Sequence, residues 1–296
     1  MISIVITSFR EPKTVGRAID SFLNQNIEED YELVVAAPDN ETQKVVIAYS
    51  KTNKKIKLFK DPGKGKSYAL NLLLSKLKGE IVILTDGDVY VSKNSVNEIS
   101  KMFRDKKVGC VSGCVISEDS RENMFGYWSH LLCDAAHRLR KNRDKKNEFL
   151  ECSGYLWAFR NNVIGGFPLD VGEDTIVPII FWTKGYGIRY VSHAKVFVKY
   201  PKNTKDFVKQ KIRTAAAHDN IGKYYDLKKI PRMKTFKNEV LGGFRIFFYP
   251  RNIKEVLWTF WLLPFRLYIW ANLFYNSRFI GKKYSDAWKP IESSKN

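Results

Sequence analysis

Short apolar runs alternate with helix-spaced apolar positions along residues 1–95 of the chain. The runs predict four buried strands, and the spacing between them predicts a helix after each of the first three. The predicted strands are 2–6, 33–37, 56–59 and 80–85, and the predicted helices are 15–23, 43–49 and 67–77. Continuous apolar strands separated by helices indicate a parallel sheet with helices on both faces. Because ligands bind at the carboxyl ends of the strands in such sheets, we expect the chemistry in the residues that follow each strand.

The rest of the chain has a mixed pattern, which predicts further elements around the same sheet. We expect helices at 96–103, 124–140, 173–182 and 204–220, and strands at 108–116 and 188–199. The charged run 138–146 is expected to form a solvated loop. The pattern therefore predicts an α/β fold with a Rossmann-like, mostly parallel sheet flanked by helices.

Residues 256–277 form an apolar stretch that contains Pro264 and is interrupted by Arg266. A helix that spans a membrane needs about 20 predominantly apolar residues. The charge and the proline favour two short amphipathic helices that lie in a membrane interface. A membrane span and a buried core segment remain as alternatives.

The formal net charge of the chain is +19, and its composition is that of a folded protein. Residues 228–296 hold 14 Lys and Arg against 4 Asp and Glu, together with four of the seven Trp residues. Basic charge mixed with aromatic and apolar side chains is typical of a segment that binds an anionic membrane surface. No nucleic-acid-binding motif accompanies the charge, so we expect no nucleic-acid partner.

The cysteines lack the spacing of a metal site, and no secretory signal precedes the first predicted strand. They are Cys110, Cys114, Cys133 and Cys152. We expect free thiols in a reducing cytoplasm. With the basic tail, this favours a peripheral or monotopic protein at the inner face of the cell membrane.

The acidic turn Asp86-Gly87-Asp88 directly follows the fourth predicted strand. Two carboxylates one residue apart can share Mg²⁺ or Mn²⁺, whose remaining ligands are substrate phosphates and water. An Asp-x-Asp sequence is common in surface turns, but the position of this one at the end of a buried strand favours a metal site.

Further motifs around this turn occur in the order of one known family. They are 4–12 (Ile-Val-Ile-Thr-Ser-Phe-Arg-Glu-Pro), 64–71 (Lys-Gly-Lys-Ser-Tyr-Ala-Leu-Asn), 172–174 (Gly-Glu-Asp) and 210–213 (Gln-Lys-Ile-Arg). Together they resemble a family 2 glycosyltransferase with the GT-A fold, close in motif style to the cellulose and hyaluronan synthases. The resemblance covers 2–219. It implies a nucleotide-sugar donor and favours a UDP-sugar. It also implies Mg²⁺ or Mn²⁺ as the cofactor.

The resemblance also implies roles for individual residues. The donor would be bound by Thr7, Phe9, Glu11, Asp39, Lys66 and Asp86. The metal would be held by Asp88 and Asp86. The substrate site would be completed by Tyr155, Trp157, Glu173 and Gln210.

The resemblance makes Asp174 the general base, which deprotonates the acceptor hydroxyl, and Arg213 the cation that stabilises the leaving diphosphate. Direct displacement of this kind inverts the anomeric centre. Without the other motifs, Glu173 and Asp174 would be interpreted as charges that complement a helix dipole. Arg213 would then be an exposed helix cation.

The chain departs from the family pattern in several places. Residues 36–39 (Ala-Ala-Pro-Asp) stand where the family usually has consecutive acidic residues. Thr214 stands where the polymerising members have Trp, which favours transfer of one sugar over polymerisation. Lys199 and Tyr200 stand where some relatives have acidic residues or His, so we expect no third protein ligand to the metal.

We expect a donor half at 1–95, an acceptor half at 96–227 and a membrane-associating segment at 228–296. This membrane-associating segment favours a lipid-linked glycan or another membrane-associated molecule as the acceptor.

Other functions remain open at this point. Gly65-Lys66-Ser67 resembles the end of a P-loop, but position 60 is Lys and the loop does not follow an early strand. A glycoside hydrolase also uses two carboxylates, but it needs no metal-binding acidic turn. A processive polysaccharide synthase and a non-catalytic membrane-binding protein on the same scaffold are the remaining alternatives.

Overall fold

The computed structural model describes residues 1–233 and 243–275. The strands are β1 (Ile2–Thr7), β2 (Tyr31–Ala37), β3 (Ile56–Lys60), β4 (Ile81–Asp86), β5 (Tyr90–Val91), β6 (Val108–Ser117), β7 (Leu156–Arg160) and β8 (Gly187–Val198). The α-helices are α1 (Val15–Leu23), α2 (Asn40–Thr52), α3 (Lys66–Leu74), α4 (Ser95–Met102), α5 (Met124–Lys145), α6 (Glu173–Thr183), α7 (Thr204–Ala216) and α9 (Ile253–Tyr275). The 3₁₀ helices are η1 (Asp219–Lys223) and η2 (Phe244–Phe248).

The strands form one sheet in the order β3-β2-β1-β4-β7-β6-β8-β5. β1, β2, β3 and β4 are parallel to one another, and β6 is parallel to β8. β7 lies antiparallel to both β4 and β6, so β4 and β6 run in the same direction. The expectation of a mostly parallel sheet is confirmed, and the carboxyl ends of β1, β4 and β6 lie at one edge.

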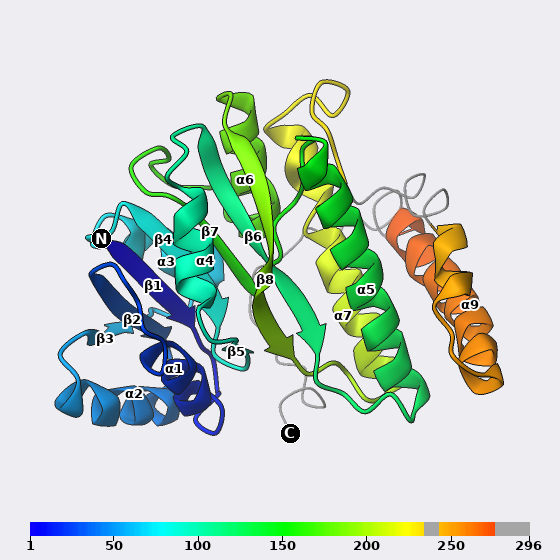
Figure 1. Ribbon diagram of the computed structural model, residues 1–296, viewed down its shortest axis with the longest axis horizontal. Coiled ribbons are helices and arrows are strands. Elements are labelled where there is room, and N and C mark those ends of the chain that lie inside the picture. Colours follow the sequence, from blue (N-terminus) through cyan, green and yellow to red (C-terminus); the bar gives the residue numbers. More distant parts are fainter. Residues whose placement is uncertain (234–242, 276–296) are drawn as a thin grey trace.

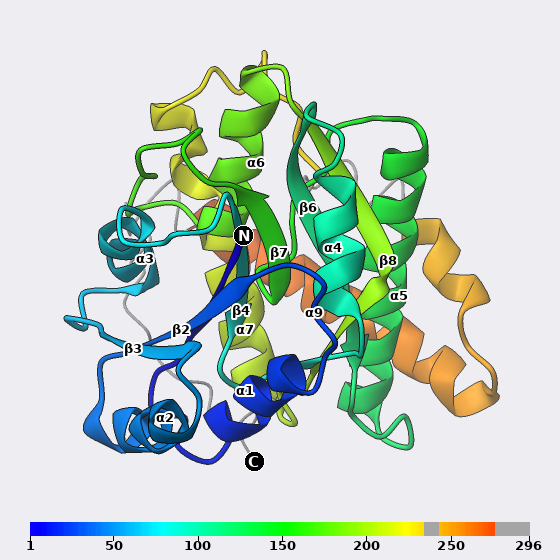
Figure 2. The ribbon, with the colours of Figure 1, turned by 60° about the vertical axis from the view of Figure 1, so that its left-hand side comes forward.

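Helices cover both faces of the sheet (Figure 1, Figure 2). On β1, Ile4 and Ile6 pack with α1, α2 and α4 on one face, and Val5 packs with α3 and α6 on the other. This alternation follows from the two-residue period of a strand. It explains why β1 and β4 are apolar along most of their length, because both faces of these strands are buried.

A third apolar cluster joins α5, α7 and α9. Its buried members include Trp128 of α5, Phe207 of α7 and Leu262 of α9. The Trp128 indole nitrogen also donates a 2.6 Å hydrogen bond to the Trp258 carbonyl of α9. Figure 1 shows α9 beside α5, at the opposite end of the molecule from α2. Helix α9 is therefore packed onto the α/β core.

Two expectations about helices were wrong. The run 138–146 continues α5 to Lys145 instead of forming a loop, because Asp144 near the end of α5 accepts hydrogen bonds from Arg189 Nε and the Tyr190 amide of β8. The apolar stretch near the C-terminus forms one helix of 23 residues that contains Pro264, not two short helices. Leu262 and Ile269 are buried on either side of the proline, so packing holds the helix together across it.

Part of the membrane-associating segment, including Trp288, lies in 234–242 and 276–296, outside the described residues. Within residues 1–233 and 243–275, no helix combines the length and the apolar composition that crossing a bilayer requires. The four cysteines are buried and free, as expected.

Candidate active site

The acidic turn lies where β1 and β4 end side by side, with Thr7 opposite Asp86 in the parallel register. The Thr7 hydroxyl donates a 3.0 Å hydrogen bond to Asp86 Oδ1. The Gly87 amide donates a 2.8 Å hydrogen bond to the Thr7 carbonyl. Because Thr7 is buried, its hydroxyl orients the first carboxylate of the turn.

Gly87 allows the turn to lie against the loop that follows β1. A Cβ atom at this position would lie 2.3 Å from Ser8 Oγ and 2.7 Å from Glu11 Oε2. Ser8 Oγ donates a 2.8 Å hydrogen bond to Glu11 Oε2, so both atoms are already held in place. Only glycine fits this contact, which buries Glu11 behind the turn.

Lys66, the first residue of α3, connects two of the sequence motifs. Its Nζ lies 2.8 Å from Asp86 Oδ1 and 2.8 Å from Glu173 Oε1. Burial acts to lower the pKa of Lys66, but the two carboxylates outweigh it and raise that pKa well above its ordinary value. A charged ammonium therefore holds the acidic turn to the first residue of α6.

Tyr155, directly before β7, lies close to several charges of the site. Burial raises the pKa of its hydroxyl, Asp88 and Asp86 raise it further, and Arg213 lowers it. Charges shift a pKa only when they lie near the titrating group. The fold thus brings the acidic turn, Tyr155 and Arg213 of α7 into one group, although they are far apart in sequence.

Asp174, the expected base, follows Glu173 in the first turn of α6. A Cβ atom at Gly154 would lie 3.1 Å from Asp174 Oδ2, and one at Gly172 would lie 3.1 Å from Asp174 Oδ1. The carboxylate therefore lies over two glycines, and Gly154 directly precedes Tyr155. Glu173, the neighbour of Asp174, is the residue that Lys66 joins to the acidic turn.

Asp39 and Phe9 lie at the expected donor side of this edge. The carboxylate of Asp39 accepts hydrogen bonds from the Arg10 amide (2.7 Å) and the Thr42 amide (3.0 Å). Burial acts to raise the pKa of Asp39, but these hydrogen bonds outweigh it, so the pKa is lowered. Asp39 caps α2 and anchors the loop of Phe9, whose ring centre lies 5.2 Å from the Arg10 guanidinium. Contact of Asp39 with a nucleobase stays a prediction.

Two further expected substrate-binding residues, Trp157 and Gln210, are also buried. Trp157 is fully buried in the cluster with α3 and α6, where its ring lies 5.3 Å from that of Phe159. It lines the core instead of the site, whereas Tyr155 lies near the acidic turn. Gln210 is buried on α7, one turn before Arg213, and its Oε1 accepts no hydrogen bond within the part of the chain that the structure describes. A buried acceptor without a donor is costly, so a substrate hydroxyl would satisfy it.

Sequence reasoning missed His218 and Glu151, which lie close to the expected base. His218 Nε2 lies 3.2 Å from Glu151 Oε2 and 3.3 Å from Thr175 Oγ1, and Thr175 directly follows Asp174. No spacing in the sequence connects these residues. Asp61 was also missed, although its position directly after β3 was a usable signal, and burial raises its pKa.

The residues at the acidic turn fit a divalent cation that substrate phosphates help to hold. Among residues 1–233 and 243–275, no cluster of three or more His, Cys, Asp or Glu side chains could bind a metal by itself. Asp86 Oδ1 contacts Thr7 and Lys66. Asp88 is the principal ligand that the family resemblance implies. One or two carboxylates with phosphate oxygens and water are a common ligand set for Mg²⁺.

The family of the chain follows from a match to a single family model. The model described as glycosyl transferase family 2 matches residues 3–165, which is more than half of the chain. The chain belongs to glycosyl transferase family 2. The matched region includes the acidic turn, Lys66 and Tyr155, whereas Asp174 and Arg213 lie beyond its end. Family membership favours a transferase over the nucleoside triphosphatase and the glycoside hydrolase.

Two curated members of the family show how far the similarity extends. An N-acetylglucosaminyltransferase of Rhizobium meliloti (strain 1021) is 21% identical over 236 residues, which cover 72% of this chain and 54% of the relative. A hyaluronan synthase of Streptococcus pyogenes is 24% identical over 163 residues, which cover 51% of this chain and 39% of the relative. The chain thus spans about half the length of the first relative and less of the second.

Solved structures establish the fold of this family 2 member. The mannosyltransferase PcManGT from Pyrobaculum calidifontis, in complex with GDP-Man and Mn²⁺, aligns with a TM-score of 0.60 at 18% identity, covering 94% of this chain and 81% of that one. S. aureus TarS 1-349, in complex with UDP-GlcNAc, aligns with a TM-score of 0.50 at 16% identity, covering 74% and 66%. The fold is the GT-A fold, as expected.

Proposed function

We propose that the protein transfers one sugar from a nucleotide-sugar donor to an acceptor hydroxyl, with inversion and with the help of Mg²⁺ or Mn²⁺. The observation that carries this proposal is the position of Lys66. Its ammonium joins Asp86 of the acidic turn to Glu173, which directly precedes Asp174. A site for a diphosphate and a candidate base thereby lie at the same edge of the sheet.

In the proposed reaction, Asp174 takes the proton of the acceptor hydroxyl as the acceptor oxygen forms a bond to the anomeric carbon. The bond from that carbon to the diphosphate oxygen breaks, and the diphosphate leaves with the electron pair. Arg213 stabilises the charge that develops on it. A divalent cation, held by Asp88 and Asp86, would neutralise further phosphate charge.

The donor is proposed to be a UDP-sugar, and the name of the Rhizobium relative makes N-acetylglucosamine the first sugar to test. Thr214, in place of the motif Trp, supports transfer of a single sugar. We assign donor binding mainly to 1–95 and acceptor binding to 96–227. The acceptor is proposed to be lipid-linked or membrane-associated, at the cytoplasmic face of an anionic membrane.

The decisive experiment replaces Asp174 by Asn, which keeps the shape of the side chain and removes the base. Metal-dependent binding of a UDP-sugar should persist, and transfer should fall by roughly 10² to 10⁴. The matched control is Asp170→Asn, which neutralises a nearby carboxylate that pairs with Lys223. Full turnover by the Asp174 variant would refute the assignment of the base, and absence of metal-dependent donor binding in the wild type would refute the proposed function.

A further inference from the structure

Helix α9 presents an apolar face to the outside of the molecule. Six of its outward side chains are each between 55% and 81% exposed: Ile253, Leu257, Phe260, Trp261, Leu267 and Tyr268. They recur three and four residues apart on one side of the helix. Phe244 and Phe248 of η2, which lies beside the start of α9, are 69% and 76% exposed. Large exposed apolar patches mark interaction sites.

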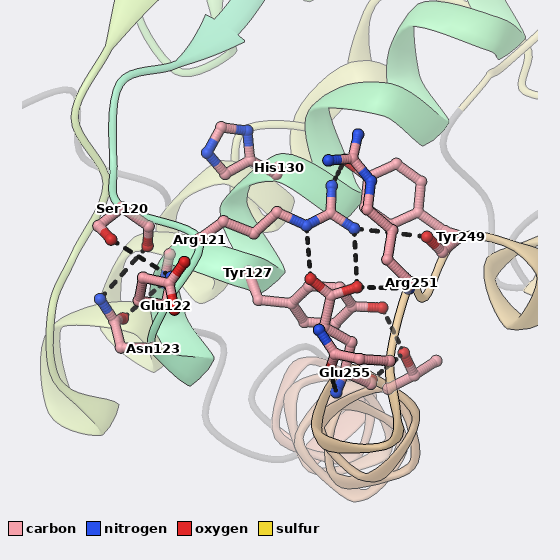
Figure 3. Close-up of polar contacts among 12 residues, drawn as sticks. Ser120, Arg121, Glu122, Asn123, Tyr127, His130, Tyr249, Arg251 and Glu255 are labelled. Atoms are coloured by element: carbon pink, nitrogen blue, oxygen red, sulfur yellow. Dashed lines mark hydrogen bonds and ion pairs between the residues drawn. The ribbon is translucent and has the colours of Figure 1, made fainter.

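Glu255 of α9, by contrast, points inward toward Arg121 (Figure 3), and Thr259 of the same helix is buried. Glu255 binds Arg121 through two contacts of 2.6 and 2.9 Å, and the Tyr127 and Thr259 hydroxyls lie 2.6 Å apart. A surface helix of a soluble protein normally shows the opposite arrangement, with its polar residues facing water. These inward contacts fix α9 to the loop before α5, so the apolar face has a defined orientation.

The exposed charges of residues 243–275 are positive. Within the described stretch 243–275, Glu255 is the one acidic residue, and its side chain is 4% exposed and paired with Arg121. Arg245, Arg251 and Lys254 are exposed. We call the outward face of α9, the exposed phenylalanines of η2 and these three cations the docking surface. It combines apolar and aromatic side chains with cations and exposes no anion.

We infer that the docking surface binds the interface of an anionic lipid bilayer, with α9 lying in the plane of the membrane. Tyr and Trp are favoured at the headgroup level, and anionic lipid complements the cations. A second copy of this chain is a poorer occupant, because two molecules with a formal net charge of +19 repel each other.

The position of α7 connects the docking surface to the reaction site. Phe207, Ile212 and Ala215 of α7 pack in the cluster with α9, while Arg213 projects from another side of the same helix. One helix therefore separates the membrane-binding element from the site, as an acceptor presented by the bilayer would require. The inference rests on the membrane location in the proposed function and adds the surface that makes the contact.

The test measures cosedimentation of the full chain with vesicles, without donor or acceptor. We expect binding to phosphatidylcholine vesicles that contain phosphatidylglycerol, and much weaker binding to phosphatidylcholine alone. Leu257→Glu/Trp261→Glu should weaken binding by roughly 100-fold, because two apolar side chains no longer enter the interface. The matched control Ile47→Glu changes a 39%-exposed apolar residue on α2 and should bind like the wild type. Arg245→Gln/Lys254→Gln should bind anionic vesicles roughly 30-fold more weakly.

Metal-dependent UDP-sugar binding and the thermal midpoint are measured for every variant in solution. Both should match the wild type, because the changed side chains point away from the core and the site. Failure of the proposed function would remove donor binding and leave vesicle binding intact. The inference is overturned if the Leu257/Trp261 variant binds anionic vesicles like the wild type, or if neutral vesicles bind equally well. It is also overturned if the wild type binds no vesicle and sediments as a dimer.

Discussion

Replacing Lys66 by Met removes the ammonium between Asp86 and Glu173 and keeps an unbranched side chain in its place. The two carboxylates then remain without the cation that each contacts at 2.8 Å. Removing one partner of a buried ion pair costs about 3–5 kcal/mol of stability. The side chain of Glu173 is 7% exposed and gains little hydration, whereas that of Asp86 is 24% exposed and recovers some. We therefore expect the lower end of that range, about 3 kcal/mol.

The assay is urea unfolding followed by tryptophan fluorescence, with the free energy of unfolding obtained by linear extrapolation. Lys64→Met is the matched control, because Lys64 is exposed on the same loop and its Nζ lies 5.3 Å from the Tyr68 ring centre. An exposed cation–π contact is worth about 0.5–1 kcal/mol. The double variant Lys66→Met/Glu173→Gln should be more stable than Lys66→Met, because the buried carboxylate becomes a neutral amide. Equal stability of the Lys66 and Lys64 variants would show that the ammonium does not hold the two motifs together.

Further outcomes follow from the same geometry. Gly87→Ala should destabilise the protein by about 1–3 kcal/mol through overpacking. Gly165→Ala is the control, because no atom lies within 4 Å of its added Cβ, and it should cost less than about 1 kcal/mol. Urea unfolding compares the two variants, and equal losses of stability would contradict the packing argument. Asp88→Ala should abolish Mn²⁺-dependent thermal stabilisation by a UDP-sugar, and unchanged stabilisation would exclude Asp88 as the metal ligand. The pKa of Glu255 is lowered, chiefly by its hydrogen bond from Arg121. The contribution of this ion pair is therefore complete above the unfolded pKa of about 4.3 and is lost as pH falls through the folded pKa. Urea unfolding from pH 7 to pH 3 should show the stability difference between wild type and Glu255→Gln shrinking below pH 4.3; a constant difference would contradict this reasoning.

Much of the donor half was predictable because its signals are local. The strand at 80–85 was expected from an apolar run, and β4 covers Ile81–Asp86. The acidic turn after it was expected at a strand end for the same reason. The strands that complete the sheet were harder to predict, because β5 has two residues and β7 pairs antiparallel with strands far away in sequence.

Burial likewise depended on contacts between distant segments. Trp157 was expected to face the acceptor, but β7 turns it into the core. Tyr155, two residues earlier, lies near the acidic turn and Arg213. The two-residue period of a strand would place both side chains on one face, but Tyr155 precedes β7 and packs against the cluster on the other face of the sheet.

The sequence by itself determined the order of the elements, the apolar character of the strands, the acidic turn and the basic, aromatic composition of the C-terminal region. These depend on the spacing of neighbouring residues, which folding does not change. Tertiary structure decided that Lys66 joins Asp86 to Glu173 and that Asp174 lies over Gly154. It also decided that α9 is one helix with Glu255 and Thr259 turned inward. Each of these depends on packing between segments that lie far apart along the chain, and packing brings charges and apolar faces together at distances that no local pattern specifies.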